Sequence, residues 1–496
     1  MQVKTHDAPT QTTRAPIFQD KDKSCQTKKK CDASTQIAPH NHPSGRTQDQ
    51  SIETVQYAHC LIQDKCDDVK AKGLRITCID WGGVTGSLLA ATYGKIDEHG
   101  WCSEFGRINF WNLSAKNYDG KPFASIEHSS YLMSVAAHPE RPSMFSAGSF
   151  NGEILLFDLN NDSQPLIACS KTNAFPINSL RWIFDANYGE WLILSMSADG
   201  YILLWTISNK LKFPIQGFNI RCNLNGEIHA LSGTAMSSSA RDIIVGSGAG
   251  VVSKIYVNSS IVFGRSTISE DGTKLRLKWS KNASRIISQV PSKLRDNMIK
   301  RIEKKAMEEK RRGVDIETVF NAGIPMKELF PIPKMMTANN QHIGPVTSVD
   351  YSYFNQDMYL TAGRDGMLKL HSSLTREILL TLEPSSKFPA EPICDAKFSK
   401  SKSTIVAFTS GEGTYIVDVK NKTPIKCPGP PAEGSDKTNK EPKMHCLAFN
   451  TRNRNLLACG DSNGMVHVWK LPSDMTQNRT GNDDKVLDEL NDAIIS

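Results

Sequence analysis

From Arg75 onward, short alternating apolar runs recur between turn residues. Seven glycines mark the repeat, and each is followed by an alternating apolar run: Gly106, Gly152, Gly200, Gly250, Gly366, Gly413 and Gly464. Successive separations are 46, 48, 50, 116, 47 and 51 residues, so the long interval holds one period and an insertion. Around each glycine the pattern predicts one strand, a second strand ending in small residues, the turn, and a third strand. A fixed period of this length is typical of repeat folds whose units bury their faces by stacking.

The third predicted strand of most units ends in an aromatic or bulky residue. Five residues after the glycine stand Trp111, Phe157, Trp205, His371 and Trp469, while Tyr256 and Val417 are displaced by one position. The period and this residue resemble the WD-repeat family of β-propellers, most closely in the stretch 342–366. No unit has the family's Gly-His pair, and several lack its Trp-Asp pair. We therefore predict an all-β, seven-bladed β-propeller over residues 75–472; a series of β-sandwiches explains the period less well.

The long interval predicts an insertion at 259–341, between blades four and five. Its middle, DNMIKRIEKKAMEEKRRG, is rich in Lys, Glu and Arg and ends at Gly313, which predicts a charged helix. A solvated helix and a helix that contacts a partner both remain open.

The N-terminal region differs in composition. Residues 1–50 have few large apolar side chains, so we expect a disordered arm. Across 51–74 an apolar stripe at spacings of 3 and 4 predicts a short helix that ends near Gly73. The stripe consists of Ile52, Val55, His59, Ile62, Cys66 and Val69. A partner-binding helix and a weak, frayed one remain open, and we expect the propeller to fold without residues 1–72. Residues 473–496 are a C-terminal tail.

The arm carries three copies of a short Gln-centred pattern. They are Ala8-Pro9-Thr10-Gln11-Thr12, Lys23-Ser24-Cys25-Gln26-Thr27 and Ala33-Ser34-Thr35-Gln36-Ile37. The pattern resembles the Lys-x-Thr-Gln-Thr motif that docks on the hub light chain of dynein, where an extended peptide adds a strand to a preformed sheet edge. The middle copy matches best, because only it has the lysine. Several copies in one arm also strengthen the binding of one another, since the second docking event is effectively intramolecular once the first has occurred.

Composition narrows the classes of function. The net charge of +7 is modest, and much of the excess lies in 21–30 and 300–312, outside the repeats, which argues against a nucleic-acid binder. Twelve cysteines without a CxxC pair predict reduced thiols, and no metal ligands. The absence of a signal sequence and of a long apolar run predicts a cytosolic chain without membrane insertion.

Catalytic motifs are also missing from the sequence. There is no P-loop, and the glycine-rich stretch 246–250 lies at a predicted blade turn. The histidines are dispersed, so we expect no catalytic residues and no cofactor.

A motif-bearing arm, a short helix and a seven-bladed propeller resemble the layout of dynein intermediate chains, in particular those of cytoplasmic dynein-2. The carrying residues are the motifs at 23–27 and 32–36 and the propeller stretches 344–350, 361–366 and 459–469. The resemblance implies a subunit of the motor for retrograde intraflagellar transport, located in the cytoplasm and at the cilium and its base. Its implied partners are a dynein heavy chain on the propeller, a second intermediate chain, hub-type and Tctex-type light chains, and a roadblock-type light chain at helix 52–69. A generic WD-repeat scaffold, a peptide-reading adaptor and an RNA-associated adaptor are the alternatives.

Overall fold

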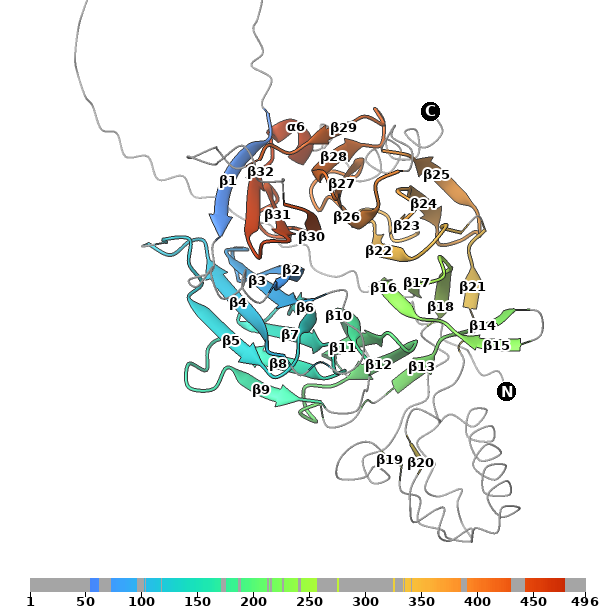
Figure 1. The fold of residues 1–496 in the computed structure, drawn as a ribbon, viewed down its shortest axis with the longest axis horizontal. Coiled ribbons are helices and arrows are strands. Elements are labelled where there is room, and N and C mark those ends of the chain that lie inside the picture. The colour runs from blue at the N-terminus through green and yellow to red at the C-terminus, as the bar shows by residue number, and fades with distance from the viewer. Residues whose placement is uncertain are drawn as a thin grey trace, which may run out of the picture. The chain divides into compact units, whose positions relative to one another are not determined.

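The computed structural model describes most of the region that the repeats cover. The described residues are 54–61, 73–95, 102, 104–116, 118–170, 175–185, 189–211, 214, 216–224, 227–239, 242–256, 274–275, 324–325, 333, 335–339, 341–384, 390–429 and 442–477. Residues from Glu53 onward belong to one compact unit. Within its described part, seven four-stranded antiparallel sheets surround a central axis (Figure 1). The predicted seven-bladed β-propeller is confirmed.

Each blade runs from an inner strand at the axis to an outer strand at the rim. The first three are β2(Arg75–Gly82) to β5(Ala124–His128), β6(Leu132–Ala137) to β9(Leu166–Cys169), and β10(Ile177–Asp185) to β13(Gln216–Asn219). Their middle strands are β3(Leu88–Gly94), β4(Gly106–Asn112), β7(Met144–Ser149), β8(Ile154–Asp158), β11(Glu190–Ser197) and β12(Tyr201–Trp205). The fifth and sixth are β22(Val346–Tyr351), β23(Met358–Gly363), β24(Leu368–Ser372), β25(Ile378–Leu382), and β26(Ile393–Phe398), β27(Ile405–Ser410), β28(Gly413–Asp418), β29(Pro424–Lys426).

The seventh blade takes its outer strand from the other end of the sequence. β30(Met444–Phe449), β31(Leu456–Asp461) and β32(Val466–Lys470) form three strands, and β1(Gln56–Leu61) pairs with β32 as the fourth. The helix predicted across 52–69 is therefore wrong over 56–61, where the chain is a strand. Tertiary pairing with β32 overrides the short helical stripe, because a stretch of six residues is too short for its pattern to distinguish a strand from a helix. The propeller begins before residue 75 and closes its ring with β1.

The long insertion lies inside the fourth blade. This blade consists of β16(Gly233–Ser238), β17(Asp242–Ser247), β18(Val252–Tyr256) and β21(Met335–Thr337). The insertion thus separates its third and fourth strands, and its predicted position between blades four and five is corrected. Between β18 and β21 the structure describes only the short pair β19(Lys274–Leu275) and β20(Ile324–Pro325) and residue Pro333, so the predicted helix lies outside the described residues.

Two small elements complete the described fold. The hairpin β14(Arg221–Leu224) and β15(Glu227–Ala230) precedes the fourth blade, and the one-turn helix α6(Ser473–Thr476) follows β32. In the described part of the chain, no helix has the length and apolar character needed to cross a bilayer.

The core lies between neighbouring blades. One buried cluster joins the first and last blades through Ile76, Trp81 and Val468, and it includes the fully buried Leu61 of β1. The tryptophans that end three of the third strands are buried, with Trp111 and Trp205 at 0% and Trp469 at 2% exposure. Burial of both faces by stacking makes the ring stable where a single blade would not be.

Candidate functional site

The residues predicted to bind light chains lie outside the described part of the structure. These are Thr10 to Thr12, Lys23 to Thr27, and Thr35 to Ile37. Of the stripe predicted to bind a partner as a helix, Ile52, Ile62 and Val69 also lie outside it. Val55 is partly buried against the core between blades six and seven, and His59 is paired in β1 with Val468. The structure therefore does not bring the stripe together as one helical face.

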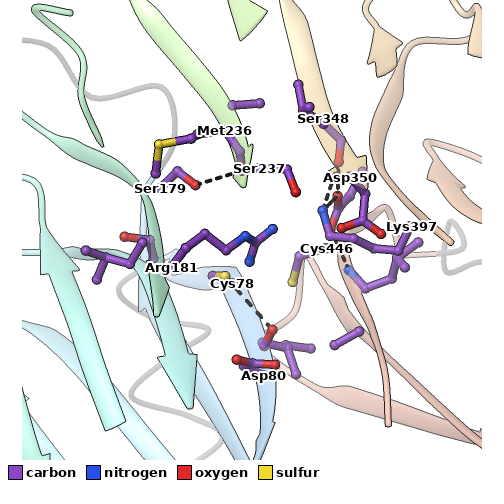
Figure 2. A pocket seen from close by; sticks show the side chains of 18 of the residues that line it. Cys78, Asp80, Ser179, Arg181, Met236, Ser237, Ser348, Asp350, Lys397 and Cys446 are labelled. Carbon is purple, nitrogen blue, oxygen red and sulfur yellow. Dashed lines mark hydrogen bonds and ion pairs between the residues drawn. The ribbon is translucent and has the colours of Figure 1, made fainter. Parts of the chain in front are cut away.

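The inner strands of all seven blades enclose a central channel, which holds a cavity of about 540 Å³ (Figure 2). Each inner strand bulges near its start, at the third residue of β2 and at the second residue of the other six, and a β-bulge turns an extra side chain away from the ladder. The seven bulged residues, all of which line the channel, are Thr77, Met133, Asn178, Thr234, Thr347, Cys394 and His445.

Four of the bulged residues connect their blade to the next one. Thr77 Oγ1 donates a hydrogen bond of 2.6 Å to the carbonyl oxygen of Leu132, the first residue of the next inner strand. The same bond, at 2.6–2.7 Å, is donated at three further junctions by these residues: Asn178, Thr234 and Thr347. Where the bulged residue is Met133, which has no donor, Ser134 Oγ donates to the Ile177 carbonyl instead. The channel wall is thus a repeated polar ladder that fixes the blades relative to one another.

A second tier of the ladder uses side-chain acceptors. Asp80 Oδ2 accepts the N–H of Ala137 at 2.8 Å, and Asp350 Oδ2 accepts the N–H of Phe398 at 3.0 Å. Ser237 Oγ likewise accepts the N–H of Tyr351 in the next inner strand at 3.2 Å. Burial raises the pKa of Asp80, although its two backbone donors and the positive charge of Arg181 oppose the shift.

Arg181 occupies the equivalent position in β10, the fifth residue of its inner strand, but it is a donor where the others are acceptors. Its side chain extends into the cavity (Figure 2). Among the described residues, no hydrogen bond or ion pair reaches its guanidinium group. The other two channel cations are paired: Lys397 with Asp395 at 2.8 Å and Lys400 with Asp350 at 3.6 Å.

Asp395 is the most heavily used carboxylate of the channel. Its Oδ1 accepts hydrogen bonds from Ser348 Oγ, the Ala396 N–H and Lys397 Nζ at 2.6–2.9 Å. Its Oδ2 accepts the N–H of Leu447 in the seventh blade at 3.0 Å. It therefore joins three consecutive blades.

The channel thiols fit a structural role. Burial raises the pKa of the Cys78 and Cys446 thiols, which keeps them protonated and poorly nucleophilic. Among the described residues, no group of three or more His, Cys, Asp or Glu side chains is arranged to hold a metal ion. The arrangement offers a rigid disc with a polar axis and loop-lined faces.

Inside the fifth blade a hydrogen-bonded chain crosses the sheet. Asp365 Oδ1 lies 2.9 Å from His342 Nδ1, and His342 Nε2 lies 2.8 Å from Thr361 Oγ1. Thr361 Oγ1 lies 2.9 Å from Nε2 of His371, which stacks on Tyr359. The seventh blade has a related chain, in which His467 joins Asp461 at 3.0 Å and Tyr57 of β1 at 2.8 Å.

Seven four-stranded blades and a closing strand from the N-terminal side define a seven-bladed β-propeller. No family model matches the chain. It is similar to cytoplasmic dynein 2 intermediate chain 2 of Mus musculus, with 26% identity over 432 residues, which covers 86% of this chain and 70% of the relative. The Homo sapiens protein of the same name is 26% identical over 442 residues, with the same coverage.

A shorter match points the same way. The 78 kDa intermediate chain of the flagellar outer-arm dynein of Chlamydomonas reinhardtii is 26% identical over 149 residues, 29% of this chain and 21% of the relative. The resemblance to dynein intermediate chains that the sequence predicts is therefore confirmed by homologues that span most of the chain.

Proposed function

We propose that this chain is a non-catalytic intermediate-chain subunit of the cytoplasmic dynein-2 motor. The observation that carries the proposal is the similarity to two cytoplasmic dynein 2 intermediate chains across 86% of the chain. The subunit links light chains on its arm to a heavy chain on its propeller, for retrograde intraflagellar transport and cilium assembly. Its location is the cytoplasm, the cilium and the ciliary base.

The arm holds light chains through the three Gln-centred motifs. An extended peptide at Lys23–Thr27 adds a strand to a hub-type light-chain dimer, where main-chain hydrogen bonds supply affinity and Gln26 sets the register. The motifs around Gln11 and Gln36 bind in the same way but more weakly, since they lack the lysine. A second intermediate chain and Tctex-type light chains complete this part of the assembly.

The closing strand supports a mechanical role for the propeller. β1 continues directly from the arm and is hydrogen-bonded along β32, so load on the arm is shared among five residue pairs. A roadblock-type light chain on a helix across 56–61 is not proposed, because that stretch is a strand.

The proposal is tested by capture of hub-type light chain on the full chain. Gln26→Ala should weaken capture more than Gln11→Ala or Gln36→Ala, because only the copy around Gln26 has the basic residue. Equal losses would contradict the ranking of the motifs, and unchanged capture by the triple variant would refute docking through the arm. A steep salt dependence would favour an electrostatic, RNA-type contact instead.

A further inference from the structure

One face of the propeller concentrates positive charge over two neighbouring blades. This face carries the loops between the first and second strands of each blade, and we call it the ab face. Three loops on it each place two cations two residues apart. We call these six residues the basic sector: Lys400, Lys402, Lys420, Lys422, Arg452 and Arg454.

Contacts between loops establish that the sector lies on one face. Lys402 Nζ, in the loop between β26 and β27, pairs with Asp418 at the end of β28 at 3.6 Å. Arg452, between β30 and β31, donates to the carbonyl oxygen of Pro139 in the corresponding loop of the second blade. The three loops therefore lie at the same end of their blades.

Two of the six cations of the sector lie near carboxylates of the same face. Lys400 and Lys402 have ion pairs of 3.6 Å with Asp350 and Asp418, a distance at which a partly exposed pair contributes little. Lys420, Lys422, Arg452 and Arg454 are all exposed. A segment with several carboxylates would find most of these charges accessible.

The chain itself supplies such a segment next to the sector. α6 lies on the ab face, where Lys402 Nζ donates a hydrogen bond of 2.9 Å to the carbonyl oxygen of Asp474, and the described structure ends at Gln477. Residues 478–496 lie outside it. Between 483 and 492 the sequence has five carboxylates and a single lysine: Asp483, Asp484, Asp488, Glu489, Asp492 and Lys485.

We propose that the acidic segment 483–492 docks on the basic sector of the same chain. The acidic segment begins near the sector along the chain, because Asp474 contacts Lys402 and Asp483 is the sixth residue after Gln477, with each residue spanning up to about 3.3–3.6 Å. A short tether also holds the segment at an effective concentration on the order of millimolar. The docked segment covers the sector against acidic partners in trans. This inference does not depend on the proposed function.

The test measures whether the tethered segment occupies the sector. A fluorescent peptide with the sequence of 478–496 is titrated with the full chain and with a neutral-tail full chain: Asp483→Asn, Asp484→Asn, Asp488→Asn, Glu489→Gln and Asp492→Asn. With a peptide Kd of about 100 μM against millimolar competition, the neutral-tail chain should bind about tenfold tighter. Binding should weaken with salt.

Two variants of the neutral-tail chain locate the binding site. Lys420→Gln, Lys422→Gln, Arg452→Gln and Arg454→Gln together should lower affinity at least about tenfold, as expected from the loss of four charge contacts. The matched control, Arg364→Gln with Lys443→Gln, removes two exposed cations from the opposite face and should leave affinity unchanged. Equal peptide affinity of the wild-type and neutral-tail chains would overturn the proposal, since the sector would then be open to acidic partners. Binding that survives the sector variant would also overturn it.

Discussion

Removal of β1 tests how the ring is closed. A chain lacking residues 1–53 keeps β1, whereas a chain lacking residues 1–61 loses it and leaves β32 as an open edge. Two side chains make the difference large. Leu61 is fully buried in the core between the first and last blades, and Tyr57 bonds the ring of the fully buried His467.

The magnitude follows from these two contacts. Truncation of a buried leucine to alanine costs about 2–5 kcal/mol, and a buried ring nitrogen left without its partner costs about 1–3 kcal/mol. Their sum reaches the lower part of the range of about 5–15 kcal/mol that stabilises a typical protein. The edge-to-face contact of Tyr57 with Trp469, at 6.1 Å between centroids, is lost as well.

The assay is urea unfolding of both truncated chains, followed by tryptophan fluorescence and circular dichroism. The chain lacking 1–53 should keep the unfolding midpoint of the full chain. The chain lacking 1–61 should show a much lower midpoint, or no cooperative transition. Leu61→Ala in the full chain serves as a point variant and should lower stability by about 2–5 kcal/mol. Identical midpoints and slopes for the two truncations would refute closure by β1, and would restore the expectation that residues 1–72 are dispensable.

Further predictions concern the channel, a turn and pH. Asp395→Ala should lower the free energy of unfolding by about 2–4 kcal/mol, because the Leu447 N–H and the Lys397 ammonium group lose their acceptor. Ser179→Ala removes a long hydrogen bond of 3.4 Å and should lower it by less than about 1 kcal/mol; urea unfolding measures both. Gly250→Ala should lower the midpoint of thermal unfolding far more than Gly189→Ala. Both glycines have positive φ, but a Cβ at residue 250 would lie 2.1 Å from the His342 carbonyl oxygen, whereas a Cβ at residue 189 would have no atom within 4 Å. Burial lowers the pKa of His371 to about 3, so only the unfolded chain takes up a proton at this residue between pH 6.5 and 5. The free energy of unfolding should therefore be about 2 kcal/mol lower at pH 5 than at neutral pH on account of this residue. His371→Gln should remove that share of the difference between urea midpoints at pH 7 and pH 5, and an unchanged difference would contradict the assignment.

Local patterns predicted the blades well. The glycine turns and the aromatic residues that follow them depend on contacts within one unit, so the sequence around Trp111 or Trp205 is sufficient to predict the strand and its burial. Contacts between distant segments were harder to predict. β1 pairs with a strand more than 400 residues away, which no periodicity can show.

A signal for the closing strand was nevertheless present. After β32 the chain continues into Pro472 and then a polar, acidic stretch, so the sequence predicts no fourth strand for the last blade on its C-terminal side. An edge of this kind needs a partner, which had to come from the N-terminal side. The position of the insertion was missed because β21 has only three residues, too few to show alternation.

The polar ladder of the channel could not be predicted either. Thr77 and Thr234 are ordinary strand residues in the sequence, and only the repeated bulge turns them toward the next blade. Arg181 is recognisable only when the inner strands are aligned, because it then stands at the position where β2 and β22 have the acceptors Asp80 and Asp350.

Purification of the tagged full chain from ciliated cells, beside a variant with Gln11→Ala, Gln26→Ala and Gln36→Ala, tests whether this chain joins light chains to a dynein heavy chain. We expect a dynein heavy chain to co-purify with both chains, and hub-type light chain to co-purify in quantity only with the wild type. Absence of any dynein heavy chain from the wild-type purification would contradict it.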